Sequence, residues 1–214
     1  MTGAEKSAVC HSRVNLLTIK GMTTFAEPAD AEQLERATQG LTDRGFAVQV
    51  VDTAEEARKL VADLVPRDKG VFTAVSETLR LAGISADLDE SGDYRSVRAE
   101  QGERAVAATP DYIVGSVHAV TEAGQVVVAS ASGSQLGPYA SGAGRVIWVV
   151  GSQKIVKDLD TGLRRTWEHT LKLESERIER LYGQPSFIAK LLIVEREHDP
   201  ERVTVVLVRE AIGF

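Results

Sequence analysis

Three short apolar runs rich in β-branched residues lie between residues 111 and 157, and they limit what this chain can fold into. They cover residues 112–117, 125–131 and 145–150. Runs of this length and composition are typical of buried β-strands. The segment between the second and third runs is rich in Ser and Gly and has no hydrophobic face, which predicts a loop. The middle of the chain is therefore expected to form a sheet with a polar loop at its edge.

Helical patterns alternate with strand patterns ahead of this stretch. Apolar spacing predicts a helix that begins near Pro28 and ends at Gly45, and another over residues 54–65. Short apolar runs at 46–51 and 71–75 predict one strand after each of these helices. A β-α-β succession predicts a parallel sheet with helices on its faces, because crossover connections are right-handed.

The last third of the chain predicts one long helix over residues 155–181, followed by strands at 189–194 and 203–208. A charged, Pro-containing turn separates these strands, so the simplest prediction is an antiparallel hairpin. The predicted fold class is α/β, with a mostly parallel sheet flanked by helices and a C-terminal antiparallel hairpin. Residues 1–21 show no apolar period and are predicted to be a disordered extension, and residues 22–214 a single domain.

Charge and composition exclude several classes of protein. The 214-residue chain has a net charge of −6, and its basic residues form no long run, which argues against nucleic-acid binding. Its single cysteine, Cys10, excludes an internal disulfide and any thiolate cage for a metal or an iron–sulfur cluster. No window reaches the roughly 18–20 apolar residues of a membrane span, and no signal-peptide pattern is present. We expect a cytoplasmic protein away from the membrane, without a metal site or a bound cofactor.

The polar loop and the ends of the predicted strands suggest a site for a small anion. Glycines permit close approach of the backbone to a ligand, and serines and an amide supply hydrogen-bonding groups. In parallel sheets, ligands lie outside the carboxyl ends of the strands, although Ser76 is equally well explained as a helix N-cap. The predicted ligand-binding residues are Ser76, Glu77, Thr78, Ser130, Ser132, Gly133, Ser134, Gln135, Gly137 and Lys154.

Glu122 is the candidate for a reacting group. It follows a predicted strand and stands two residues before Gly124, where an exposed carboxylate can act as a general base or a nucleophile. A plain turn residue is the alternative interpretation. His118 stands near the end of the same strand and is predicted to be a buried, hydrogen-bonded histidine, since no second ligand is suitably spaced for a metal.

Two long segments resemble a known family. They read S-V-H-A-V-T-E-A-G-Q-V-V-V-A-S-A-S-G-S-Q-L and R-V-I-W-V-V-G-S-Q-K-I-V-K-D-L-D, and they are similar to the LUD domain of lactate-utilisation proteins. With earlier segments such as R-G-F-A-V-Q-V-V, the resemblance covers about residues 32–165. It implies a fold similar to the NagB/RpiA/CoA-transferase group, whose members bind sugar phosphates, CoA or related anions at strand ends.

The resemblance leaves several functions open. One is an anion-binding or accessory subunit in the conversion of L-lactate to pyruvate, with a carboxylate, phosphate or CoA-like ligand and with iron–sulfur or flavin oxidoreductase subunits as partners. Another is a free-standing enzyme resembling CoA transferases or sugar-phosphate isomerases, in which Glu122 reacts. A third is a purely structural interaction module. Whether the chain is an enzyme therefore stays open at this point.

Overall fold

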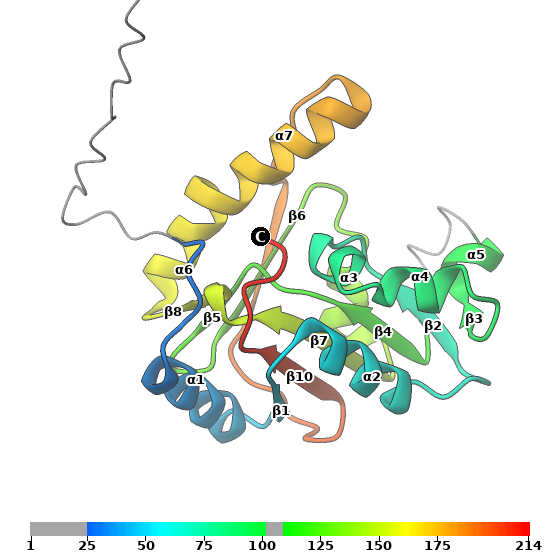
Figure 1. Ribbon diagram of the computed structural model, residues 1–214, viewed down its shortest axis with the longest axis horizontal. Coiled ribbons are helices and arrows are strands. Elements are labelled where there is room, and N and C mark those ends of the chain that lie inside the picture. The colour runs from blue at the N-terminus through cyan, green and yellow to red at the C-terminus, as the bar shows by residue number, and fades with distance from the viewer. Residues whose placement is uncertain (1–24, 102–108) are drawn as a thin grey trace, which may run out of the picture.

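The computed structural model describes residues 25–101 and 109–214, which contain two β-sheets with helices packed around them (Figure 1). The larger sheet is all parallel, with the strand order β1-β10-β7-β4-β2-β3. Its strands are β1 (Ala47–Val51), β2 (Gly70–Thr73), β3 (Arg95–Ser96), β4 (Tyr112–Gly115), β7 (Arg145–Gly151) and β10 (Val203–Val208). The predicted α/β class with a mostly parallel sheet is confirmed.

The smaller sheet is mixed and has the order β8-β5-β6-β9. Its strands are β5 (Ala119–Thr121), β6 (Val126–Ser130), β8 (Ile155–Val156) and β9 (Lys190–Val194). Only β5 and β8 run parallel; β6 pairs antiparallel with both β5 and β9.

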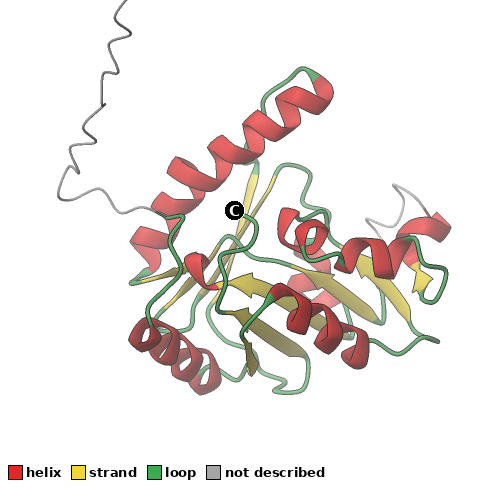
Figure 2. Cartoon of the chain, viewed as in Figure 1, coloured by secondary structure: helices red, strands yellow, loops and turns green. Residues whose placement is uncertain are grey.

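Seven α-helices and three shorter helical turns surround the sheets in the part of the chain that the structure describes (Figure 2). The helices are α1 (Ala31–Asp43), α2 (Ala54–Leu64), α3 (Glu77–Leu81), α4 (Ile84–Asp89), α5 (Val97–Gln101), α6 (Leu159–Arg165) and α7 (Leu171–Tyr182). The turns are the π-helical η2 (Pro138–Gly142) and η4 (Thr166–Thr170) and the 3-10 turn η3 (Ser152–Lys154).

The strands of the large sheet are apolar on both faces because each face carries its own core. On one face, residues such as Trp148 and Val205 pack with α1 and the small sheet. On the other, their neighbours such as Val149 and Val206 pack with α2, α3 and α4. Near-continuous apolar strands are expected in a parallel sheet that is covered twice.

The small sheet adds a further layer. One face joins the core shared with α1, and the other, which includes Ala119 and Val127, packs beneath α6. Beyond η4 the chain continues as α7, which projects away from the sheets (Figure 1) and has no buried residue. The layers are therefore, in order, the helices α2, α3 and α4, the large sheet, the small sheet with α1, and finally α6, which continues through η4 into α7.

Local signals explain where the first helices begin. The Asp30 side chain accepts a hydrogen bond from the Gln33 amide while the Gln33 side chain accepts one from the Asp30 amide, a reciprocal cap at the start of α1. Thr53 caps α2 in a similar way through the amide of Glu56. Gly45 follows α1 with a φ of 86°, a conformation that glycine adopts without strain.

The predicted C-terminal hairpin is wrong, although both of its strands exist. β9 pairs with β6 in the small sheet, whereas β10 lies between β1 and β7 in the large one. All of β10 except Thr204 is buried, while β9 exposes Leu191 and Ile193. The apolar pattern located the strands, but nearness in sequence did not determine their partners.

The predicted long helix over residues 155–181 is also wrong at its start. Ile155 and Val156 form β8, and α6 begins only after Asp158, whose carboxylate accepts a hydrogen bond from the Thr161 amide at 2.9 Å. The helix then passes through the π-helical η4 before α7. The polar composition of residues 82–101 predicts a solvated loop, but these residues contain α4, β3 and α5.

Two predictions fall wholly or partly outside the described residues. The predicted disordered extension over residues 1–21 lies outside them, and so does most of a helix predicted near residues 100–108. Within residues 25–101 and 109–214, no helix is both long enough and apolar enough to cross a membrane.

Candidate functional site

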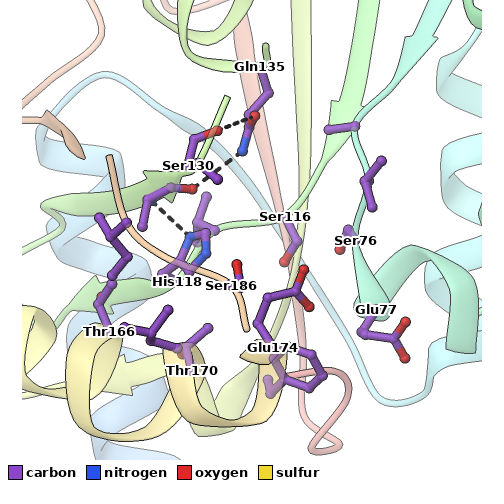
Figure 3. A pocket seen from close by; sticks show the side chains of 18 of the residues that line it. Ser76, Glu77, Ser116, His118, Ser130, Gln135, Thr166, Thr170, Glu174 and Ser186 are labelled. Atoms are coloured by element: carbon purple, nitrogen blue, oxygen red, sulfur yellow. Dashed lines mark hydrogen bonds between the residues drawn. The ribbon is translucent and has the colours of Figure 1, made fainter. Parts of the chain in front are cut away.

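A cavity of about 270 Å³ lies where the parallel strands β2, β4 and β7 end. The residues that follow these strands form one side, the end of β6 and its loop form another, and η4 and α7 cover a third (Figure 3). Carboxyl ends of parallel strands point the same way, so the polar residues after each strand meet at one edge of the sheet. The predicted location of a site is thus matched by a cavity.

Lys154 contributes a buried amine to this cavity. It ends the 3-10 turn η3 directly after β7, and its side chain is 1% exposed. Its amine nitrogen lies 2.9 Å from Thr78 Oγ1 and 3.0 Å from Ser116 Oγ. Burial, together with the charge of Arg165, sets the pKa of Lys154 well below its ordinary value. The contacts of this amine within the described residues are hydroxyl groups, and no carboxylate pairs with it.

Arg165, at the end of α6, is a buried cation close to Lys154. Its guanidinium donates to the carbonyl oxygens of His118 at 2.6 Å and Gln153 at 3.3 Å, and to Thr170 Oγ1 at 3.0 Å. Burial lowers its pKa to about 10, so it stays charged at neutral pH. Its partners in the described chain are neutral oxygens, and the interior beside the cavity therefore carries uncompensated positive charge.

His118 forms part of the cavity wall and is uncharged. Its Nδ1 accepts a hydrogen bond from the Ala129 amide at 3.1 Å, which assigns the ring proton to Nε2. Burial and the charges of Lys154 and Arg165 lower its pKa to about 3. The predicted hydrogen bond of this histidine is confirmed, but the residue is half-buried rather than fully buried, and it lines the cavity.

Tyr139 enters the cavity wall from the π-helical turn η2. Its ring packs edge-on against Trp148, with centroids 5.4 Å apart. Its hydroxyl is buried and has no hydrogen bond of regular geometry within the described residues, although the Ser116 backbone and the Trp148 side chain lie near it and partly offset the burial that raises its pKa. The hydroxyl lies over Gly115, where any Cβ atom would overlap it. Glycine at this position makes room for a buried phenol whose hydroxyl is available to a ligand.

The Ser/Gly loop after β6 is held in shape by its own polar groups. Ser130 Oγ accepts from the Gly133 amide at 2.8 Å and lies 3.0 Å from Gln135 Oε1 (Figure 3). Gly133 has a φ of 88°, and Lys190 packs so closely that an added Cβ would lie 2.8 Å from its Cδ. The conformation of this loop therefore depends on glycine.

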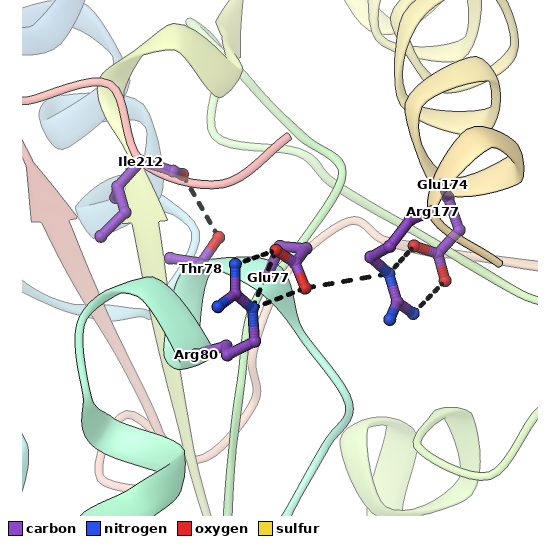
Figure 4. Close-up of polar contacts among 6 residues, drawn as sticks. All are labelled: Glu77, Thr78, Arg80, Glu174, Arg177 and Ile212. Atoms are coloured by element: carbon purple, nitrogen blue, oxygen red, sulfur yellow. Dashed lines mark hydrogen bonds and ion pairs between the residues drawn. The ribbon is translucent and has the colours of Figure 1, made fainter. Parts of the chain in front are cut away.

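Charged residues stand at the mouth of the cavity. Glu77 at the start of α3 contacts Arg80 at 2.8 Å and faces Arg177 of α7 at 3.8 Å, while Arg177 also binds Glu174 at 2.7 Å (Figure 4). The Arg80 guanidinium is the main reason why the pKa of Glu77 is lowered. These contacts link α3 to the projecting α7 across the cavity.

Comparison with known proteins agrees with this architecture. The family model of the LUD domain matches residues 34–208. The chain belongs to the LUD domain family. The fold is also similar to the crystal structure of a DUF162 family protein from Deinococcus radiodurans, with a TM-score of 0.50 and 17% sequence identity over 85% of this chain and 99% of that one. The curated proteins contain no match.

Most of the predicted ligand-binding residues of this LUD domain meet at the cavity. Those that line it are Ser76, Glu77, Ser130, Ser132, Ser134, Gln135 and Lys154. Thr78 does not line it but contacts the Lys154 amine, and Gly133 and Gly137 belong to the loop backbone without lining the cavity. Ser76 occupies the N-cap position of α3, yet its side chain makes no capping hydrogen bond.

Glu122 does not lie with the others, so the prediction that it lines the same pocket is wrong. It occupies a separate shallow depression, where its carboxylate accepts a hydrogen bond from Arg36 Nε at 2.6 Å. The turn that carries it packs on α1 through Gly40 and Gly124, whose backbones leave no room for a Cβ atom on either. In the LUD domain, this glutamate and its glycine join the small sheet to α1.

Sequence analysis did not select Ser116, Tyr139, Glu174 or Arg177, all of which line the cavity. A signal existed for Ser116, because it follows Gly115 at the end of an apolar run, the same placement that singled out Ser76. The two α7 residues gave no signal, since an ion pair on a helix face is common on any surface. Only the position of α7 in space brings them to the LUD-domain cavity.

Proposed function

We propose that this LUD-domain protein binds a small organic carboxylate in the cavity and acts as a ligand-binding or accessory subunit in the metabolism of L-lactate and pyruvate. The observation that carries the proposal is the buried Arg165 guanidinium beside the cavity, together with the buried Lys154 amine that lines it; neither has a carboxylate partner in the described chain. A buried cation without a counter-charge is unfavourable, and an anionic ligand supplies that charge.

The polar groups of the cavity suit a ligand that carries oxygen atoms besides its carboxylate. Ser76 and Ser116 lie on one side and Ser130 and Ser132 on another, while Tyr139 adds a hydroxyl without a partner. Hydroxyl groups donate to or accept from a ligand hydroxyl or carbonyl oxygen equally well. A 2-hydroxy acid or a 2-oxo acid fulfils both requirements.

The size of the cavity favours a small ligand. Its volume of about 270 Å³ lies just below the roughly 300–1,000 Å³ that is usual for sites of drug-sized molecules. Lactate and pyruvate have six heavy atoms each and are small enough for this volume. A whole CoA molecule would extend far beyond the mouth of the cavity. We therefore place carboxylates ahead of CoA, phosphate and sugar phosphates.

The accessory role follows from the family and from the side chains at the site. The LUD domain is associated with lactate utilisation. Removal of two electrons from lactate needs an electron acceptor. Iron–sulfur or flavin oxidoreductase subunits are the proposed partners for that step, with this protein holding the carboxylate.

Calorimetric titration with L-lactate, pyruvate, phosphate and CoA tests the proposal. Lactate and pyruvate are expected to bind, and Lys154→Met should weaken both by about 10- to 100-fold, because a charge-assisted hydrogen bond contributes roughly 1.5–3 kcal/mol. Lys157→Met is the matched control, since Lys157 is exposed and does not line the cavity. Thermal melting of each variant checks that it is folded.

The same titrations can also contradict the proposed binding of a carboxylate. Absence of carboxylate binding by the wild-type protein would contradict the proposal, and so would unchanged affinity in a folded Lys154→Met variant. Tight binding of phosphate or CoA with no binding of lactate or pyruvate would move the site to another class of anion.

A further inference from the structure

The Lys154 amine is placed to act as a nucleophile. It is shielded from solvent, is held by the hydroxyl oxygens of Thr78 and Ser116, and lines a cavity that has room for a ligand. Its depressed pKa favours the neutral amine, which has a lone pair free to attack an electrophile. An ordinary surface lysine at pH 7.4 is neutral only about once in a thousand molecules.

We propose that Lys154 forms a covalent imine with a small 2-oxo acid bound in the cavity. This inference rests on the proposed carboxylate site and identifies the substrate class that reacts there. The carbonyl carbon of a 2-oxo acid is directly bonded to the carboxylate carbon. A carboxylate drawn to the buried positive charge therefore brings its own electrophilic carbon close to the amine.

The reaction balances without an oxidant or a reductant. The nitrogen lone pair forms a bond to the carbonyl carbon, and the π electrons of the carbonyl move to its oxygen. A proton passes from nitrogen to that oxygen, which gives a carbinolamine. The carbon–oxygen bond then breaks, the oxygen leaves as water after taking up a second proton, and the nitrogen remains doubly bonded to carbon.

Two side chains can donate hydrogen bonds to the reacting oxygen, while the protons come from the amine and from solvent water. His118 is neutral and carries its ring hydrogen on Nε2, so it can donate a hydrogen bond to the developing alkoxide. Tyr139 presents a hydroxyl that has no hydrogen-bond partner in the described chain. Neither group carries a charge at neutral pH that would hold the amine in its protonated form.

The charges around Lys154 are compatible with the adduct. The ionisable groups that share its surroundings come from α3, the segment after β4, η2, α6 and α7; they are Glu77, His118, Tyr139, Arg165, Glu174 and Arg177. Glu77 and Glu174 are each bound by an arginine at the mouth, and neither contacts the amine. A protonated imine of a 2-oxo acid has its own carboxylate one bond away, so the buried adduct is neutral overall.

Trapping with cyanoborohydride tests the inference. The full-length protein is incubated with pyruvate and the reductant near pH 7.4, and the reduced adduct is located by proteolysis and mass spectrometry. Labelling of Lys154 is expected to exceed that of Lys157 by at least about tenfold, because ordinary lysines are almost wholly protonated at this pH. Lys154→Met should lose the adduct, Lys157→Met should keep it, and excess L-lactate should protect against it.

The outcomes separate this inference from the proposed function. Binding of L-lactate and pyruvate without a Lys154 adduct would overturn the imine and leave the carboxylate site standing. An adduct spread evenly over surface lysines, or retained in Lys154→Met, would overturn it as well. Mapping the adduct in the wild-type protein keeps the test decisive even if a Lys154 variant does not fold.

Discussion

The amine nitrogen of Lys154 lies 2.9 Å from the hydroxyl oxygen of Thr78, and this contact joins the end of β7 to the start of α3. Thr78 in turn donates to the carbonyl oxygen of Ile212 at 3.3 Å, so the segment after β10 is tied to the same point (Figure 4). An amine held by three segments has little freedom to turn away from the cavity. A ligand that binds in the cavity therefore lies beside this amine and changes its protonation state.

Binding of L-lactate should be coupled to proton uptake. Burial and Arg165 lower the pKa of Lys154 in the empty protein, whereas a carboxylate beside the amine raises it, so the complex binds more protons than the free protein. The calorimetric enthalpy should then change with the ionisation enthalpy of the buffer, with uptake of up to about one proton per site. Affinity should fall as pH rises through the range in which the amine loses its proton.

Variants identify the group that takes up this proton. Lys154→Met should remove the buffer dependence, and Lys157→Met should keep it. His118 also has a lowered pKa and faces the same cavity, so His118→Gln is the second variant to measure. A lactate-binding enthalpy that is identical in all buffers would show that Lys154 does not titrate on binding.

The amino-acid pattern predicted the fold class well because the central strands of the large sheet are covered on both faces. A run such as residues 146–150 stays apolar at every position only if both faces are buried. Pairing was less predictable, since β9 and β10 are both apolar and only their contacts with β6 and β7 assign them to different sheets. Sequence proximity favoured a hairpin, and tertiary packing prevented it.

The site was partly predictable for a related reason. Residues that follow parallel strands converge at one sheet edge, which is why Ser76 and Lys154 were found. Glu122 follows β5, which belongs to the small sheet, so the same rule placed it wrongly. Arg177 comes from a helix whose position follows from the π-helical η4 before it, a feature that no periodic pattern indicates.

Tyr139→Phe should separate stability from binding. The buried hydroxyl has no partner in the described chain, so its removal should leave the free energy of unfolding unchanged or raise it by about 1 kcal/mol. Carboxylate affinity should fall several-fold if the ligand uses this hydroxyl. Urea denaturation and calorimetry measure the two effects, and Tyr182→Phe on the exposed end of α7 is the control. Destabilisation well above 1 kcal/mol would mean that the hydroxyl is already satisfied.

His118 should make the protein sensitive to acid. Its folded-state pKa of about 3 lies below the ordinary 6.5, so the unfolded chain binds an extra proton between these values. The free energy of unfolding should therefore decrease as pH falls from 6.5 towards 3. His118→Gln should reduce this slope, whereas His198→Gln in the exposed turn before β10 should not. Urea denaturation at several pH values gives the slopes, and equal slopes in wild type and His118→Gln would contradict the assignment.

Glu122→Gln should leave the binding of lactate and pyruvate unchanged. The carboxylate lies outside the cavity and pairs with Arg36, which is half exposed, so solvent screens the pair and it contributes little to stability. Calorimetry and thermal melting measure both quantities. Loss of ligand binding in a folded Glu122→Gln variant would restore this residue to the site.

Gly124, two residues after Glu122, should contribute far more to the free energy of unfolding than the Glu122 carboxylate does. Gly124 has a φ of 85°, and a Cβ atom there would overlap the backbone of Gly40 in α1. Gly124→Ala should lower the free energy of unfolding by about 3 kcal/mol, because it adds left-handed strain to a clash between two backbones. Gly137→Ala is the control, since its φ is −61° and no atom lies within 4 Å of the added Cβ. Similar denaturation midpoints for the two variants would show that α1 can move away from the small sheet, and the contact between Gly40 and Gly124 would then not fix their separation.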